Sequence, residues 1–282
     1  MSQQVHAVSV EGLRVLSGTV AAAFTPLRND GQTVDDDVIS AYVEFLAAGG
    51  IDGILAVGSA GEGMLLTAEE RRFVAECYRK ATAGKLALAV HAGAMTTAET
   101  AAHAEHAAAI GADAVVAIAP PFYAYDDDAL VEHFAAAAAA CFPVPFYVYE
   151  YAERIGYAID VSVIERLREC APNLRGIKVT DFPFSAVEPY LALDGIDVFI
   201  GMDWLIPEGL AKGARGAASG LAAIDPSFVS DLVRSPSPDK AKAARERIAV
   251  YGPHLITRGK AELAKRGLMR ADVRRPLLPF SL

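Results

Sequence analysis

The chain has 282 residues, of which 53% are hydrophobic, and a formal net charge of −9 at pH 7. It is long enough to bury a large core, and its acidic balance argues against the basic face that nucleic-acid binding requires. Its three cysteines, Cys77, Cys141 and Cys170, are widely spaced and include no CxxC pair, so we expect reduced thiols rather than disulfides or a metal site.

No segment has the pattern of a signal peptide or a membrane span. The first 16 residues lack a basic region followed by a continuous apolar stretch. The most apolar segment, Ala135–Tyr149, has only 15 residues and contains Pro143 and Pro145. We therefore expect a cytoplasmic protein that acts on a small molecule and has neither a membrane nor a nucleic acid as partner.

Apolar runs alternate with amphipathic helical patterns along most of the chain. The runs expected to be strands are Gly18–Phe24, Gly53–Gly58, Leu86–His91, Ala114–Ala119, Val144–Tyr151, Leu174–Asp181, Ile196–Asp203 and Gly216–Ala223. The helices expected after them cover residues 35–48, 67 onward, 97–110, 127–141, 160–170, 184–193, 204–212 and 225 onward. Two starts match a capping box, at Thr67 with Glu70 and at Ser162 with Glu165.

Eight strand-then-helix units imply a parallel sheet that closes into a barrel, so we predict an α/β fold, the (β/α)8 TIM barrel. A doubly wound open sheet is the alternative, but Thr25-Pro26 after the first strand is not its glycine-rich fingerprint. Beyond the linker-like segment 235–238 the pattern is purely helical. We therefore divide the chain into a catalytic barrel, residues 1–234, and a C-terminal helical extension, residues 235–282.

One lysine, Lys178, interrupts the apolar run Leu174–Asp181. Strand alternation places Ile177 and Val179 on the face toward the helices. Lys178 and Thr180 then face the barrel interior, near the carboxyl ends of the strands, where barrel enzymes keep their active sites. An ammonium group loses hydration there, which favours the nucleophilic free amine. From this segment alone, a lysine that reaches solvent or pairs with a carboxylate is an equal alternative.

Other functional candidates are the polar residues and loops expected at the carboxyl ends of strands. They are Thr25, the loop Gly58–Glu62, His91, Tyr123, Tyr149, Arg154, Thr180, Asp203 and Ser219. Four motifs fall at such positions: GSAGE at 58–62, PPFY at 120–123, Y-x4-R-x-G at 149–156 and GIK at 176–178. In this order they resemble, over essentially the whole chain, the dihydrodipicolinate synthase and N-acetylneuraminate lyase family of pyruvate-dependent class I aldolases.

The resemblance implies that Lys178 forms a Schiff base with pyruvate or another 2-oxo acid, with no metal and no other cofactor. It implies that Tyr149 is the acid/base beside the iminium and that Ser59 passes protons between Tyr149 and Tyr123. In relatives the tyrosine at the position of Tyr123 completes the site of a neighbouring subunit, which implies a homodimer or homotetramer. For Tyr149 the alternative is a core aromatic, and for Tyr123 it is a packed aromatic on a rigid loop, Pro120–Tyr123.

The resemblance also implies a set of substrate-binding residues: Gly58, Ala60, Arg154, Thr180 and Ala218. Backbone N–H groups at Ser59 and Ala60 would bind the pyruvate carboxylate. Arg154 stands where synthases keep an arginine for the carboxylate of the second substrate. An ion pair of this arginine with Glu150 or Glu153 is the alternative.

Several positions depart from the family pattern and leave the second substrate open. Ala60 replaces a common threonine, and Glu150 and Ala152 replace the usual asparagine and proline. We expect a carbon–carbon lyase or synthase, either dihydrodipicolinate synthase-like or 2-keto-3-deoxy sugar acid aldolase-like. A dehydratase that uses the same lysine enamine, and a barrel that binds a ligand without turnover, are the alternatives.

The histidines carry weaker signals. His103 and His106 lie three apart on an expected helix, but no third ligand accompanies them, so we expect a solvated helix face rather than a metal site. His91 could either line the pocket or be a hydrogen-bonded structural residue.

Overall fold

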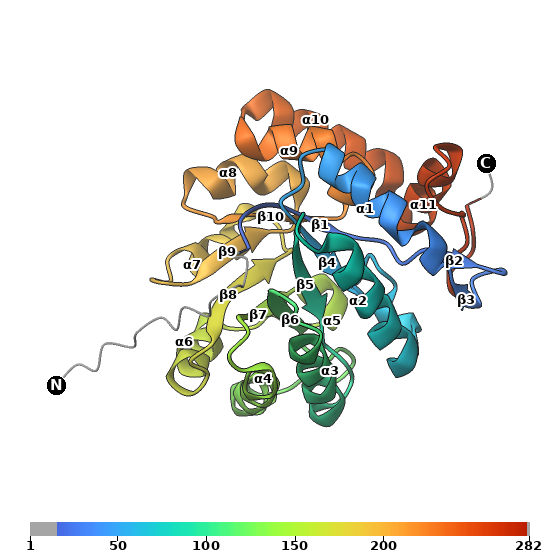
Figure 1. Ribbon diagram of the computed structural model, residues 1–282. Helices are drawn as coiled ribbons and strands as arrows, with labels where there is room; N and C mark the ends of the chain where they lie inside the picture. Colours follow the sequence, from blue (N-terminus) through green and yellow to red (C-terminus); the bar gives the residue numbers. More distant parts are fainter. Residues whose placement is uncertain (1–15, 281–282) are drawn as a thin grey trace.

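The computed structural model describes residues 16–280, and in it eight parallel strands close into a barrel (Figure 1). Around the barrel the strands follow the order β1-β10-β9-β8-β7-β6-β5-β4. Their bounds are Gly18–Ala22 (β1), Gly53–Ala56 (β4), Ala87–His91 (β5), Ala114–Ile118 (β6), Phe146–Glu150 (β7), Leu174–Val179 (β8), Asp197–Ile200 (β9) and Gly216–Ser219 (β10). The predicted (β/α)8 barrel is confirmed. The expectation about the first 16 residues falls almost wholly outside the described part.

Helices surround this sheet on its outer side (Figure 1). The α-helices within the barrel part are Ile39–Ala48 (α1), Ala68–Thr82 (α2), Thr97–Ala109 (α3), Asp127–Cys141 (α4), Ala152–Ile155 (α5), Val161–Cys170 (α6), Glu188–Leu191 (α7), Ile206–Ala211 (α8) and Pro226–Arg234 (α9). Short 3-10 turns cover Asp36–Val38 (η1), Gly63–Leu65 (η2), Phe184–Ala186 (η3), Asp203–Leu205 (η4), Leu221–Ala223 (η5) and Gly252–His254 (η6). Thr67 caps α2 through the predicted capping box with Glu70.

The strands are buried on both faces, which explains their continuous apolar runs. Every residue of β5, β6 and β7 is buried. Leu55, Val116 and Phe199 point into the barrel, and the residues next to them alternate toward the helices. Two apolar layers result, one inside the barrel and one between the sheet and the helices.

Some local predictions were wrong. A small hairpin, Leu27–Arg28 (β2) with Thr33–Val34 (β3), follows the first strand and was not expected. The expected strand through Ala223 ends at Ser219, where the chain turns into η5. The cap of α6 is Asp160, which accepts from Ser162 N at 2.8 Å, so Ser162 does not begin a capping box.

The C-terminal extension consists of Pro238–Tyr251 (α10) and Leu255–Lys265 (α11), which pack beside the barrel (Figure 1). Residues 235–237 connect α9 to α10, and Ser237 caps α10. The division at residue 234 stays a prediction. Within residues 16–280, no helix combines the length and the apolar character needed to cross a membrane. All three cysteines are free, as expected.

Candidate active site

Lys178 and Tyr149 face each other across the ladder between β7 and β8. They are register partners near the carboxyl ends of these strands. Lys178 Nζ lies 3.9 Å from the centre of the Tyr149 ring, and the two residues are 7% and 2% exposed. Within residues 16–280, no carboxylate forms an ion pair with Lys178. The ion-paired alternative is therefore wrong, and the amine lies unpaired against an aromatic face.

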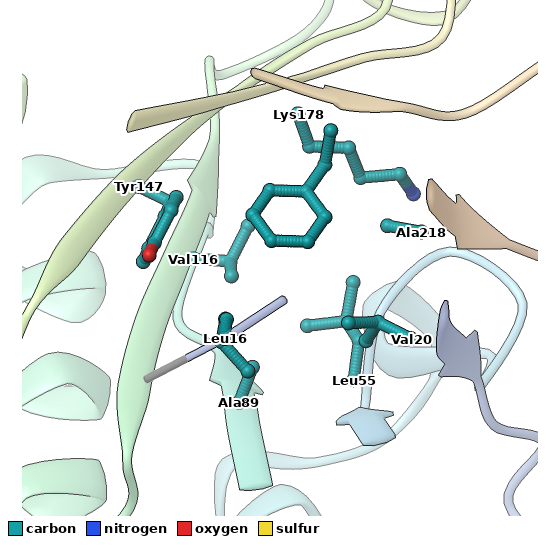
Figure 2. A pocket seen from close by; sticks show the side chains of 9 residues that line it. Leu16, Val20, Leu55, Ala89, Val116, Tyr147, Lys178 and Ala218 are labelled. Carbon is teal, nitrogen blue, oxygen red and sulfur yellow. The ribbon is translucent and has the colours of Figure 1, made fainter. Parts of the chain in front are cut away.

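Below Lys178 the barrel interior is filled by apolar side chains. A cavity of about 20 Å³ remains, lined by Leu16, Val20, Leu55, Ala89, Val116, Tyr147, Lys178, Phe199 and Ala218. Figure 2 shows the lysine side chain along one edge of this cavity, with Nζ pointing toward Ala218. A space of this size holds about one water molecule. A keto acid must therefore reach Nζ from the carboxyl-terminal mouth of the barrel.

The Gly58–Glu62 loop follows β4 at this mouth. Val57 before it and Glu62 at its end have φ values of 51° and 57°, which are uncommon for residues with a side chain and indicate a strained loop. Ser59 is exposed and Ala60 is half-buried. Their backbone N–H groups have no hydrogen-bond partner among residues 16–280. Two donors are thus available for an anion.

A buried network fixes this loop from the side of the C-terminal extension. Thr25 Oγ1 donates to Gly61 O at 2.6 Å. Glu62 forms an ion pair with Lys260 of α11, and both are buried. Glu62 also accepts from Arg274 N at 2.6 Å. Burial lowers the pKa of Lys260, and the neighbouring Glu62 opposes that shift. The extension therefore helps to hold the loop in place.

Polar groups from β8 to β10 complete the surroundings of Lys178. Thr180 is 8% exposed, and its Oγ1 has no hydrogen-bond partner among the described residues. Asp203 accepts a hydrogen bond from Ser219. Burial raises the pKa of Asp203 to about 6, against the effects of Ser219 and Lys178. This hydroxyl lies against Gly201, and an unpartnered buried hydroxyl is a group that a substrate or a water molecule can satisfy.

His91 supports the Tyr149 ring from β5. The two rings meet edge to face at 6.3 Å. Ile118 N donates to His91 Nε2 at 3.3 Å, and Arg71 donates to His91 O at 2.8 Å. Burial, with added repulsion from Arg71 and Lys178, lowers the pKa of His91 well below its ordinary value. Of the two roles considered for His91, the structure supports the hydrogen-bonded structural one.

Tyr123 lies apart from this centre, on the exposed loop between β6 and α4. It is 60% exposed, its neighbour Phe122 is 82% exposed, and the two rings meet edge to face at 4.9 Å. Within one described copy of the chain, no hydrogen bond joins the hydroxyls of Tyr123, Tyr149 and Ser59. The predicted proton relay therefore stays a prediction.

Arg154 lies on α5 at the exposed rim. Its Cζ is 5.6 Å from the centre of the Tyr151 ring, and hydrogen bonding to Tyr151 raises its pKa. In the described part of the chain it forms no ion pair with Glu150 or Glu153, so that alternative is wrong. Besides its contact with Tyr151, the exposed guanidinium forms no ion pair within residues 16–280, so it can also bind an anion.

The two histidines of α3, His103 and His106, were expected on a solvated helix face, and for His103 this expectation is wrong. His103 is buried at 4% exposure and lies 3.8 Å from Glu99, so it is not on a solvated face. His106 pairs with Glu76 at 3.1 Å. Across residues 16–280 no group of three or more His, Cys, Asp or Glu side chains is arranged to hold a metal ion.

Comparison with known proteins agrees with this geometry. The family model of the dihydrodipicolinate synthetase family matches residues 15–282. The chain belongs to this family. The 4-hydroxy-tetrahydrodipicolinate synthase of Sorangium cellulosum is 31% identical over 94% of the chain and 91% of the relative. The structure of Proteus mirabilis N-acetylneuraminate lyase matches with a TM-score of 0.85, 30% identity and 94% coverage of each chain.

A further similar structure is the dihydrodipicolinate synthase of Acinetobacter baumannii complexed with pyruvate, with a TM-score of 0.85 and 27% identity over 95% of this chain and 94% of that one. Membership of the dihydrodipicolinate synthetase family makes this protein an enzyme of the lyase class, among the pyruvate-dependent aldolases and synthases. Sequence reasoning assigned no role to Arg71 or Lys260, and it did not pair Glu62 with Lys260 or Glu150 with Asp181, because these partners are distant in sequence.

Proposed function

We propose that the protein is a Schiff-base aldolase or synthase for 2-oxo acids, with Lys178 as the nucleophile. One observation supports this most: Lys178 is a buried amine that forms no ion pair within residues 16–280 and is held against the Tyr149 ring at the catalytic end of a barrel. It needs no metal and no other cofactor.

In the proposed reaction Lys178 Nζ attacks the keto carbon of pyruvate, and water leaves as the iminium forms. The iminium accepts electrons from the adjacent methyl C–H bond, whose proton goes to a base, and an enamine results. The enamine carbon then attacks an aldehyde, or the reverse sequence cleaves a longer keto acid. Tyr149 delivers and removes protons beside the iminium, a role worth about 10²–10⁴ in rate.

The Gly58–Glu62 loop offers hydrogen-bond donors for the substrate carboxylate. We place it on the unpartnered N–H groups of Ser59 and Ala60. The Thr180 hydroxyl and the surface at Ala218 then flank the reacting carbons. Arg154 would bind the carboxylate of a second substrate.

The exposed Phe122–Tyr123 loop supports assembly into a homodimer or homotetramer. Two adjacent aromatic side chains at 82% and 60% exposure are unusual on a surface that stays in water. In the assembly Tyr123 would approach Tyr149 and Ser59 of a neighbouring copy and complete the proton relay. Tyr123→Ala should shift the sedimentation profile toward smaller species at low protein concentration.

Exchange of the pyruvate methyl protons for deuterium in D2O, followed by NMR, tests the proposal without knowledge of the second substrate. Enamine formation predicts enzyme-dependent exchange that Lys178→Arg abolishes. The absence of exchange by the wild-type protein at saturating pyruvate would contradict it. If pyruvate raised the melting temperature yet no exchange occurred, the alternative of a ligand-binding barrel would hold.

A second assay separates the remaining reaction types. Turnover of aspartate semialdehyde with pyruvate would identify a synthase, whereas cleavage of 2-keto-3-deoxy sugar acids would identify an aldolase. Loss of water from the same acids without carbon–carbon cleavage would identify a dehydratase. Arg154, which forms no ion pair among the described residues, favours a second substrate that carries a carboxylate.

A further inference from the structure

Glu150 and Asp181 form a buried pair of carboxyl groups directly behind the Lys178–Tyr149 pair. Glu150 follows Tyr149 at the end of β7, and Asp181 lies two residues beyond the end of β8. Strand alternation turns both side chains away from the barrel interior, toward the helices. Glu150 is 0% exposed and Asp181 is 8% exposed.

Backbone N–H groups donate hydrogen bonds to only some of the four carboxyl oxygens of this pair. Ile159 N donates to Glu150 Oε2 at 3.2 Å, and Ala152 N donates to Asp181 Oδ1 at 3.0 Å. Glu150 Oε1 has no N–H or O–H partner among the described residues, and the Asp181 carboxyl lies within hydrogen-bonding reach of Glu150. Two ionised carboxylates can only accept, so this contact becomes a hydrogen bond when a proton lies between them.

Among the described residues, no positively charged side chain is paired with Glu150. The titratable groups facing it, besides Asp181, are Glu153 of α5, Tyr190 of α7 and Tyr157 on the loop before α6. Within residues 16–280, no lysine or arginine forms an ion pair with Glu150 or Asp181. Two like charges in such a site would be unstable, which favours retention of one proton.

The two basic side chains closest in sequence are directed elsewhere. Arg154 of α5 lies over the Tyr151 ring, and Lys178 lies on the opposite face of the sheet. Asp160 at the start of α6 adds negative charge near Tyr190, so it does not stabilise an ionised pair. Burial, with a further contribution from Asp181, raises the pKa of Glu150 to about 9.

We propose that Glu150 is a positioning residue that shares one proton with Asp181, and that this hydrogen bond holds β7 beside β8 so that Tyr149 stays opposite Lys178. The inference rests on the proposed function, because Tyr149 and Lys178 are its reacting groups. The shared proton acts beside the backbone bond from Thr180 N to Glu150 O, 2.9 Å long. The shared proton thus links side chains at the ends of β7 and β8, in addition to the backbone hydrogen bonds that link the two strands.

Melting temperatures test the shared proton. Glu150→Gln replaces the protonated acid by an amide that can donate to Asp181 and still accept from Ile159 N. In the unfolded chain Glu150 ionises near pH 4.5, whereas in the fold it keeps its proton to about pH 9. The wild type should therefore lose stability relative to Glu150→Gln as the pH rises through this interval. We expect the variant to melt at least about 5 °C higher at pH 8, with a smaller difference at pH 5.

The control is Glu153→Gln, which removes an exposed carboxyl from the same cleft. It should leave the melting temperature unchanged at both pH values. A Glu150→Gln difference that does not grow with pH, or a wild type that is more stable than the variant at pH 8, would show that Glu150 is ionised in the fold. Either result would overturn the proposal.

Deuterium exchange into pyruvate tests the positioning role. Glu150→Leu, which has no donor, should slow exchange at least about tenfold and leave the half-saturating pyruvate concentration unchanged, because small displacements of Tyr149 reduce the rate of proton transfer. Glu150→Gln should stay within about threefold of the wild type. A Glu150→Leu variant with wild-type exchange would contradict this role. If the wild type itself gave no exchange, the proposed function would fail, and the melting experiment would still decide whether the proton is shared.

Discussion

Lys178 Nζ lies 3.9 Å from the centre of the Tyr149 ring, and the two residues are direct partners in the β7–β8 ladder. Their separation is therefore set by the spacing of hydrogen-bonded strands, about 4.8 Å, rather than by a mobile loop. A nucleophile and a proton donor placed on rigid elements hold their geometry better than groups on loops. This relationship explains why the carboxyl end of this strand pair is the centre of the site.

Replacement of Tyr149 by phenylalanine should remove proton transfer and keep the packing. The ring contacts with Lys178 and His91 remain, whereas the hydroxyl is lost. We expect deuterium exchange into pyruvate to slow by about 10²–10⁴, with the half-saturating pyruvate concentration changed little. A rate within threefold of the wild type would show that Tyr149 is not the acid/base.

Replacement of Lys260 by methionine should destabilise the fold from a position outside the barrel. It leaves Glu62 buried without its counterion, which typically costs about 3–5 kcal/mol in the free energy of unfolding. Lys265→Met is the matched control on the same helix, because its pair with Glu262 is 3.8 Å long and exposed. That change should cost less than about 1 kcal/mol. Urea unfolding measures both, and equal losses would contradict the structural role of Lys260.

Replacement of Asp203 by asparagine should change the pH dependence of stability. Asp203 ionises near 3.8 in the unfolded chain and near 6 in the fold, so the folded protein holds an extra proton between these values. Wild-type stability should therefore fall, relative to Asp203→Asn, by about 2 kcal/mol as the pH rises from 4 to 6. Urea unfolding at both pH values gives the difference. A constant difference would show that Asp203 ionises normally in the fold.

The barrel was predictable because its signals are local. A buried parallel strand is a short apolar run, and Thr67 with Glu70 marks a helix start through neighbours alone. Lys178 was identified in the same way, as a charge within an apolar strand. The β2–β3 hairpin was missed because its strands have two residues each, too few to show a periodic pattern.

Contacts between distant segments could not be predicted. Glu62 and Lys260 are separated by about two hundred residues, and nothing near either one marks the partner. The burial of His103 was missed because α3 packs against α2 and α4, and its own sequence does not mark the side that they cover. Glu150 was noted as a departure from the family pattern and as a possible ion-pair partner of Arg154. Its role in the proposed shared proton depends on Asp181, which lies thirty-one residues later in the sequence. The barrel fold brings Asp181, just beyond the end of the neighbouring strand β8, next to Glu150.

Reduction with borohydride in the presence of pyruvate, followed by peptide mass spectrometry, tests the central claim most directly. An iminium on Lys178 is reduced to a stable secondary amine that carries the pyruvyl group. The account predicts this adduct on the peptide that contains Lys178, loss of deuterium exchange in proportion to labelling, and no adduct in Lys178→Arg. An unlabelled Lys178 at saturating pyruvate, or an adduct confined to another lysine, would contradict it.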